Sequence, residues 1–423
     1  MISLAAFRSL RYYDFRLIWI AQFVSTLGTQ IQTVALAWLV YVITGSPAAL
    51  GGIGLARAVP TILLSLFGGT LADQLNRRRL LLVTQCALAV LSALLAVAVS
   101  LGLTSIPLFY GFAVITAAAE AFDSPTSQAI IPQLVPREVL SNALTINVIG
   151  SDVAAVLGPT VGGLVLGYVG TSAAFWLDAA SFLVVVGALL AMRSRPVTPR
   201  LRRGGVAALL DGLHFVRRRG MLWQLMVIDF LATLFVSQSG LLPVFARDVL
   251  KVGAQGLGLL YAAPSAGAVI GAAIFAFAPT PQRPGRAVTL AIAGYGLVLV
   301  LFGLSPTFLM ALLFLAVSGG LDAVSMAMRH TVRQLATPNE LRGRVGALAG
   351  VFSGGGPRLG EFQSGLAASL VGARDAMVFG GMACVAMVLT SRWWGRDLWS
   401  YQGEEEPNVA GAPEAKETVR IGD

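Results

Sequence analysis

Apolar stretches about as long as a bilayer is thick recur along the whole chain, and this pattern limits what the chain can fold into. A helix needs about 20 mostly apolar residues to cross the hydrocarbon core of a membrane. Twelve such stretches, separated by charged residues, Pro or Gly, lie at about 16–43, 48–72, 80–101, 106–131, 140–168, 172–192, 221–246, 254–278, 287–304, 307–330, 343–370 and 374–392. They predict an all-α membrane protein with twelve transmembrane helices.

The composition excludes a soluble fold. Of the 423 residues, 56% are hydrophobic and 12% are charged, whereas soluble domains are about one quarter charged. A surface with so few charges cannot keep a protein of this size dispersed in water. The lipid bilayer is therefore the expected surroundings of this chain.

The Lys and Arg residues favour one side of the predicted spans. If the amino terminus is cytoplasmic, most of the 30 basic residues fall in cytoplasmic segments. The exceptions are Arg247, Lys251 and Arg374 in outer loops and Arg57, Arg329 and Arg358 within spans. This asymmetry predicts a multi-pass protein of the cell membrane with both termini in the cytoplasm. It also accounts for the net charge of +9 without a nucleic-acid partner.

The longest polar interruption, at 193–220, divides the spans into two groups of six. We expect an N-terminal six-helix bundle at 1–192 and a C-terminal bundle at 221–400. The interruption holds a basic run and then apolar residues at helical spacing from Val206 to Val216, which predicts a cytoplasmic linker with a helix on the membrane surface. The tail at 401–423 is acidic and rich in Pro, Gly and Ala, which predicts disorder.

The two halves of the chain are related by an internal repeat. Shifting the sequence by 202 positions brings the fourth span onto the tenth without a gap, so that Glu120 meets Asp322 and Pro136 meets Pro338. Parallel six-helix repeats with a site between them are a recurring transporter architecture, because two similar bundles can rock about a central site. The fold expected is therefore two parallel six-helix repeats.

A motif between the second and third spans carries a family resemblance. The run Gly69-Thr70-Leu71-Ala72-Asp73-Gln74-Leu75-Asn76-Arg77-Arg78-Arg79 resembles the loop signature G-x-L-A-D-R-x-G-R-R of the major facilitator superfamily, with Gln74 in place of Arg and Asn76 in place of Gly. The resemblance implies that Gly69 permits close helix packing and that Asp73 caps or pairs with a helix end. It implies that Arg77 and Arg78 help to hold a cytoplasmic gate.

The fifth span adds a second motif. The run Ala154-x-x-x-Gly158-Pro159-x-x-Gly162-Gly163 is similar to an element of the antiporter branches of that superfamily. Small residues let a neighbouring helix approach, and Pro159 bends the span because it removes one backbone hydrogen bond. Together with the opening Phe15-Arg16-Leu17-Ile18-Trp19, the pattern resembles the drug and siderophore exporters, the enterobactin-exporter and macrolide-efflux group. This implies a bacterial-type inner membrane.

Ionisable residues inside the spans are the candidates for coupling to protons. A charge at bilayer depth is costly and usually faces a water-filled cavity or a partner. An acid in an apolar cavity also has a raised pKa, which suits a group that loads and unloads protons near neutral pH. The candidates are Glu120, Asp322, Asp123 and Asp152. For Glu120 and Asp322, a proton site and a buried structural ion pair both remain open.

Other polar residues are candidates for lining a substrate cavity. The first span carries Gln22, Thr26, Thr29 and Thr33, whose hydrogen-bonding groups would be unsatisfied against lipid. Asp229 lies in the seventh span. Arg358 and Glu361, three residues apart in the eleventh span, fit a local ion pair better than a substrate contact, and Arg57 is expected to neutralise one of the acids.

The function expected from these features is secondary active transport, with export of amphiphilic small molecules in exchange for protons and by alternating access as the leading hypothesis. A proton symporter or facilitator that imports a nutrient is the alternative. A membrane receptor or enzyme is a third possibility, but we find no nucleophile motif or phosphate-binding glycine loop. Cys86 and Cys384, and His214 and His330, lack metal-ligand spacing. We expect a monomer without cofactor or metal.

Overall fold

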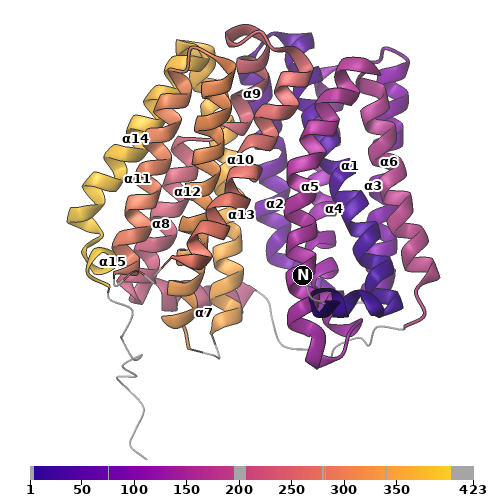
Figure 1. Ribbon diagram of the computed structural model, residues 1–423, viewed down its shortest axis with the longest axis horizontal. Coiled ribbons are helices and arrows are strands. Elements are labelled where there is room, and N and C mark those ends of the chain that lie inside the picture. Colours follow the sequence, from indigo (N-terminus) through magenta and orange to yellow (C-terminus); the bar gives the residue numbers. More distant parts are fainter. Residues whose placement is uncertain are drawn as a thin grey trace, which may run out of the picture.

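The chain folds into two helical bundles that stand side by side (Figure 1). The computed structural model describes residues 4–74, 76–194, 206–278, 281, 283–338 and 341–401, and for residues 4–7, 65–74 and 206–210 it describes the backbone only. The amino terminus and helix α7 lie at the lower end in Figure 1, which we call the amino-terminal end. Helix α9 lies at the opposite end, which we call the far end.

The first half forms the bundle on the right in Figure 1. Its elements are η1 (Leu4–Arg11), α1 (Tyr13–Thr44), α2 (Pro47–Gln74), α3 (Arg77–Ser100), α4 (Ile106–Ile130), η2 (Ile131–Gln133), η3 (Arg137–Val139), α5 (Leu140–Tyr168) and α6 (Thr171–Ala191). Local sequence explains the boundaries. Gly45 ends α1 with a φ of 60°, a conformation that glycine adopts without strain. The side chain of Asn76 caps α3 by accepting from the amide of Arg79.

The second half forms the bundle on the left. Its elements are α7 (Val206–Arg218), α8 (Gly220–Phe235), η4 (Ser239–Leu241), α9 (Leu242–Val244), the π-helical turn η5 (Phe245–Val249), α10 (Gly253–Phe277), α11 (Pro284–Gly303), α12 (Phe308–Leu335), α13 (Arg342–Val371), α14 (Ala373–Trp394) and α15 (Arg396–Ser400). Thr307 begins α12 by accepting a hydrogen bond from the amide of Met310.

Twelve helices have the length and position of membrane spans. Among the described residues, 11 are long and apolar enough to cross a bilayer, with Gly220–Val249 counted as one span. The remaining span is α13, which has 30 residues and carries Arg342, Arg344, Arg358 and Glu361. It packs along α2 and α8, and Arg358 and Glu361 of this helix line a cavity described below. The predicted all-α membrane fold is confirmed.

The seventh span differs from the continuous helix predicted at 221–246. Helix α8 ends at Phe235, and Val236 is extended with φ −136° and ψ 104°. The chain resumes at Ser239 as η4, α9 and η5. The local sequence Ser237-Gln238-Ser239-Gly240 favours a helix less than the flanking apolar residues do, but the hydropathy of the whole span hides this interruption.

Glycines bring the two bundles into contact at two crossings. Helix α5 crosses α10, where a Cβ added to Gly163 would lie 2.8 Å from Cα of Gly258. Helix α2 crosses α13, where a Cβ added to Gly365 would lie 2.8 Å from Cα of Gly51. Side chains at these positions would hold the helices apart, so glycine allows backbone-to-backbone packing. Both crossings lie toward the far end of the molecule.

The linker helix α7 lies across the amino-terminal end of the second bundle (Figure 1). Val216 is fully buried and packs with Leu222 and Val345, and Leu213 contacts the same cluster. Arg344 of α13 forms an ion pair with Asp211 of α7 at 3.1 Å. This part of α7 therefore packs on α8 and α13; its predicted place on the membrane surface stays a prediction. Linker residues 195–205 and tail residues 402–423 lie outside the described residues.

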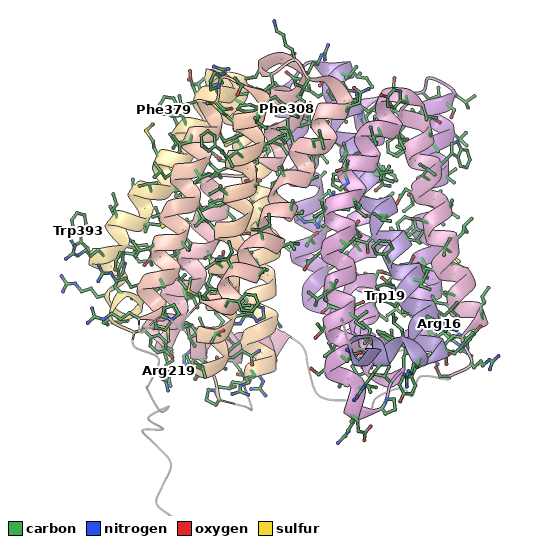
Figure 2. All side chains as sticks on the ribbon, viewed as in Figure 1. Arg16, Trp19, Arg219, Phe308, Phe379 and Trp393 are labelled. Atoms are coloured by element: carbon green, nitrogen blue, oxygen red, sulfur yellow. The ribbon has the colours of Figure 1, made fainter. Side chains whose placement is uncertain are left out.

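Basic residues from the two halves share the amino-terminal end. Figure 2 shows Arg16 of α1 and Arg219, which precedes α8, at this end, and Phe308 and Phe379 near the other. The sequence placed Arg16 and Arg219 on one side of the bilayer, and the structure brings them to the same end.

Candidate transport site

A cavity of about 1490 Å³ lies between the two bundles. The first bundle supplies most of its wall, including Gln22, Thr26, Thr29 and Thr33 of α1. The second bundle contributes residues of α13 only, among them Gly346, Gly350 and Gly354. The first bundle thus supplies many hydroxyl and amide side chains, and α13 supplies small residues together with Arg358 and Glu361.

A cluster of charges joins the two bundles in this cavity. Arg57 Nη2 of α2 lies 3.2 Å from Glu120 Oε2 of α4, and Arg358 Nη2 of α13 lies 3.9 Å from the same oxygen. The side chains of these three residues are between 22% and 26% exposed. One carboxylate therefore faces two guanidinium groups, one from each half. The ion-pair interpretation of Arg57 agrees with this geometry.

Glu361 lies one helical turn from Arg358 and also lines the cavity. Its Oε1 accepts a hydrogen bond of 2.8 Å from the hydroxyl of Ser239, just after the break in the seventh span. Gly54 of α2 makes room for it, because a Cβ there would lie 2.7 Å from Cβ of Glu361. The sequence favoured a local pair between Arg358 and Glu361, but Arg358 reaches Glu120 across the cavity and Glu361 binds Ser239.

Asp123 lines the same cavity in a different setting. Its Oδ1 accepts hydrogen bonds from the hydroxyl of Thr84 at 2.6 Å and from Gln85 Nε2 at 3.0 Å. Both donors lie on α3. Neutral hydrogen bonds thus hold Asp123, whereas guanidinium groups hold Glu120.

Two other acids of the second bundle, Asp229 and Asp322, lie outside the cavity wall. Asp229 of α8 forms an ion pair with Arg329 of α12, and Ser353 also donates to Asp229 at 3.4 Å. Asp322 is 54% exposed and lies 3.5 Å from Arg329. Neither acid is among the residues that line the described cavity. Asp229, which the sequence predicted to line a substrate cavity, forms an ion pair between α8 and α12 in this structure.

The repeat relates Glu120 to Asp322, but the two residues have different surroundings. Glu120 meets a cation from each bundle, whereas the ion-pair partner of Asp322 is a residue of its own helix. Asp152 of α5 is exposed and does not line the described cavity. We therefore find Glu120 and Asp123, of the four proton-site candidates, in the cavity wall.

The gate motif is described in part. Arg77 Nη1 donates to the carbonyl of Ala129 near the end of α4 at 2.7 Å, and Arg78 Nη2 donates to the carbonyl of Leu190 at the end of α6 at 3.2 Å. Helix carboxyl ends attract cations in this way. Gly69 and Asp73 lie where only the backbone of α2 is described, so the predicted contacts of Asp73 fall outside the described residues.

The antiporter-like motif lies at helix contacts and not in the cavity wall. A Cβ on Gly158 would lie 2.5 Å from Cβ of Gln30, and one on Gly162 would lie 3.1 Å from Cα of Ile31. Gly163 faces α10, as described above, and the carbonyl of Pro159 lies against Gly258. The motif therefore packs α5 against α1 on one side and against α10 of the other bundle on the other side.

Polar contacts join the bundles at the far end. The hydroxyl of Tyr41, near the end of α1, forms a hydrogen bond with Asp248 of η5. Arg247 Nη1 donates to the carbonyls of Tyr41 and Val42 at 3.2 and 3.4 Å. The sequence placed Arg247 in an outer loop and did not single out Asp248. No local pattern marks them, because their partners are about 200 residues away in the chain.

Known proteins resemble this chain along most of its length. The sequence profile of the family described as transmembrane secretion effector matches residues 4–398. The enterobactin exporter EntS of Escherichia coli O81 (strain ED1a) is 29% identical over 341 residues, which cover 79% of this chain and 80% of that protein. EntS of Shigella boydii serotype 4 (strain Sb227) matches with the same identity and coverage.

Solved transporter structures share the fold. The nucleoside transporter NupG, as its D323A mutant, superimposes with a TM-score of 0.77 at 12% identity and covers 90% of this chain and 99% of that one. A bacterial homologue of the human lysosomal transporter Spinster, in an inward-facing and occupied conformation, gives a TM-score of 0.71 at 18% identity, with 93% and 99% covered. At these identities the likeness shows the fold alone.

Proposed function

We propose, from the premise that this chain belongs to the transmembrane secretion effector family of the major facilitator superfamily, that it expels amphiphilic small molecules from the cell in exchange for protons. The observation that carries this proposal is the cavity between the bundles, where Glu120 faces Arg57 and Arg358 from opposite halves. A carboxylate in this position contacts both bundles, which must move relative to each other during alternating access.

In our proposal, the cavity faces the cytoplasm in this conformation. Its wall includes Trp19, Leu144 and Gly346, close to the beginnings of α1, α5 and α13 at the amino-terminal end. The glycine crossings and the contacts of Tyr41 with Asp248 close the far end. The distribution of basic residues assigns the amino-terminal end to the cytoplasm. Substrate therefore enters from the cytoplasm.

The cavity wall suits a substrate that combines aromatic rings with many hydrogen-bonding groups. Trp19 and Phe23 are stacked with ring centroids 6.1 Å apart, and both line the cavity. Hydroxyl and amide side chains of α1 and α4 line it as well, among them Thr26, Gln30 and Gln128. Rings stack on the aromatic pair and polar groups bind the amides and hydroxyls. The named function of the EntS relatives makes a siderophore such as enterobactin our first candidate.

Protonation of Glu120 supplies the coupling. The ionised carboxylate attracts Arg57 of its own half and Arg358 of the other half, which favours the present conformation. A proton on Glu120 cancels both attractions and shifts the balance between the inward- and outward-facing states. The cycle of alternating access then exchanges one substrate for protons.

Inverted inner-membrane vesicles test this function with purified enterobactin as the probe. We expect vesicles that contain the protein to accumulate enterobactin when their interior is acidified, and vesicles without it to accumulate none above background. A protonophore should abolish the accumulation. Equal accumulation with and without a proton gradient would contradict the coupling, and uptake only into right-side-out vesicles would contradict export.

A further inference from the structure

The helix of the seventh span is interrupted at 236–238. Side chains of neighbouring helices form hydrogen bonds with the chain at and next to this interruption. The amide of Ser237 donates to the hydroxyl of Ser364 at 3.4 Å, and the hydroxyl of Tyr261 donates to the carbonyl of Ser239 at 2.9 Å. Tyr295 donates to Oε1 of Gln238 at 2.8 Å. Irregular backbone at membrane depth is tolerated where protein groups replace its lost hydrogen bonds. Three helices, α10, α11 and α13, supply these groups.

One of the contacts at the break reaches the cavity. Ser239, the first residue of η4, donates its hydroxyl to Oε1 of Glu361. Gly240 allows this approach, because a Cβ there would lie 3.2 Å from Cα of Glu361. A hydrogen bond to an ionised carboxylate is about twice as strong as one between neutral groups. The hydrogen bond from Ser239 is therefore stronger when Glu361 is ionised than when Glu361 is neutral.

The segment that begins at Ser239 ends at the contact between the two bundles. The segment from Ser239 to Val249, the last residue of η5, is 11 residues long. Near this end, Asp248 binds the hydroxyl of Tyr41 and Arg247 binds the last carbonyls of α1. This segment therefore contacts Glu361 of the cavity at its start. At its end it contacts Tyr41 and Val42 of the first bundle at the far end of the molecule.

We propose that Ser239 couples the cavity to the far-end closure, as a positioning residue that holds segment 239–249 against Glu361. When a proton or a bound cationic group of the substrate neutralises Glu361, the hydrogen bond from Ser239 to Glu361 weakens. The segment then moves about the break at 236–238 and separates Asp248 from Tyr41. This inference rests on the proposed transport function, and it assigns the opening of the far end to one hydrogen bond.

Distances between spin labels at the far end test the coupling. Labels on cysteines at Val169 of the first half and Leu370 of the second, which are 71% and 79% exposed, report the separation of the bundles. All proteins carry Cys86→Ala and Cys384→Ala so that only these sites react. We expect Ser239→Ala to raise the ratio of long to short distances by about tenfold, the effect of losing one hydrogen bond to a charged group.

Matched variants separate coupling from general damage. Ser239→Thr keeps the hydroxyl and should restore the distances of the parent protein. Ser369→Ala removes a hydroxyl that bonds only within its own helix, to the carbonyl of Leu366, and should change nothing. Glu361→Gln should open the far end, and adding Ser239→Ala to it should have little further effect.

The decisive comparison uses Tyr41→Phe, which removes the closure directly and should also favour the long distances. If Tyr41→Phe opens the far end and Ser239→Ala does not, the coupling is wrong. It is also wrong if Ser239→Ala and Glu361→Gln act additively, because the two residues would then act independently. The measurement needs no substrate or proton gradient, so a failure of the proposed export would appear in the vesicles and not in these distances.

Discussion

Several charges within the spans of this protein have partners of opposite charge. Arg57 and Arg358 face Glu120, and Arg329 faces Asp229. Burying a single charge without a partner costs several kcal/mol or more. The sequence identified these residues as candidates from their position in apolar spans. It did not identify the pairs, because each pair joins residues far apart in the chain.

Glu120→Gln is predicted to abolish proton-driven transport while leaving the protein folded. The amide keeps the size and hydrogen-bonding capacity of the side chain but cannot exchange a proton or attract two guanidinium groups. We expect accumulation in inverted vesicles to fall to about one tenth or less of the parent rate. The exposed Glu138, in a connecting loop, provides the control Glu138→Gln. Normal transport by Glu120→Gln would assign Glu120 a structural role.

Asp229→Asn is predicted to destabilise the second bundle. It leaves Arg329, which is 13% exposed, without its buried carboxylate, at a cost of about 3 kcal/mol. The midpoint temperature of thermal unfolding of the purified protein in detergent should fall. Adding Arg329→Met removes the unpaired charge and should recover part of the loss. A midpoint equal to that of the parent would show that the pair contributes nothing to stability.

At the scale of helices, close contact between the bundles depends on glycine. Gly163 meets Gly258, and Gly51 meets Gly365, with no side chain between the backbones. The motif around Gly158 marked α5 as a packing helix before the structure was available, and the structure adds its partners, α1 and α10. The break in the seventh span was missed, because its stabilising groups come from other helices.

Gly163→Ala is predicted to prevent closure of the far end. The new Cβ would lie 2.8 Å from the backbone of α10, so α5 and α10 must separate. We expect the transport rate to fall at least about fivefold, since even one extra methyl in close packing costs about 1 kcal/mol or more. Gly187→Ala is the matched control, because a Cβ on Gly187 of α6 meets nothing within 4 Å. Equal transport by both variants would contradict the role of this crossing.

For the whole molecule, orientation in the membrane follows from the placement of charge. Basic residues of both halves gather at the amino-terminal end, as Arg16 and Arg219 illustrate (Figure 2). That end is expected to face the cytoplasm. The cavity wall includes Trp19, Leu144 and Gly346, which lie near the beginnings of α1, α5 and α13 at the same end.

Cysteine labelling of whole cells checks this orientation. In a protein with Cys86→Ala and Cys384→Ala, we expect Leu103→Cys, in the exposed turn after α3, to react with a membrane-impermeant maleimide added outside. Arg137→Cys, between α4 and α5, should react only after the cells are opened. The reverse pattern would place the termini outside the cell.

The sequence by itself determined the class of structure and its symmetry. Span length, scarcity of charge, the 202-residue repeat and the two motifs are local or periodic signals, and these suffice for an all-α, twelve-helix transporter of this superfamily. Only the tertiary structure decided which charges meet, that Glu120 and Asp322 have different surroundings, and that Ser239 donates a hydrogen bond to Glu361. These facts depend on contacts between distant segments, and hydropathy and spacing describe each segment alone.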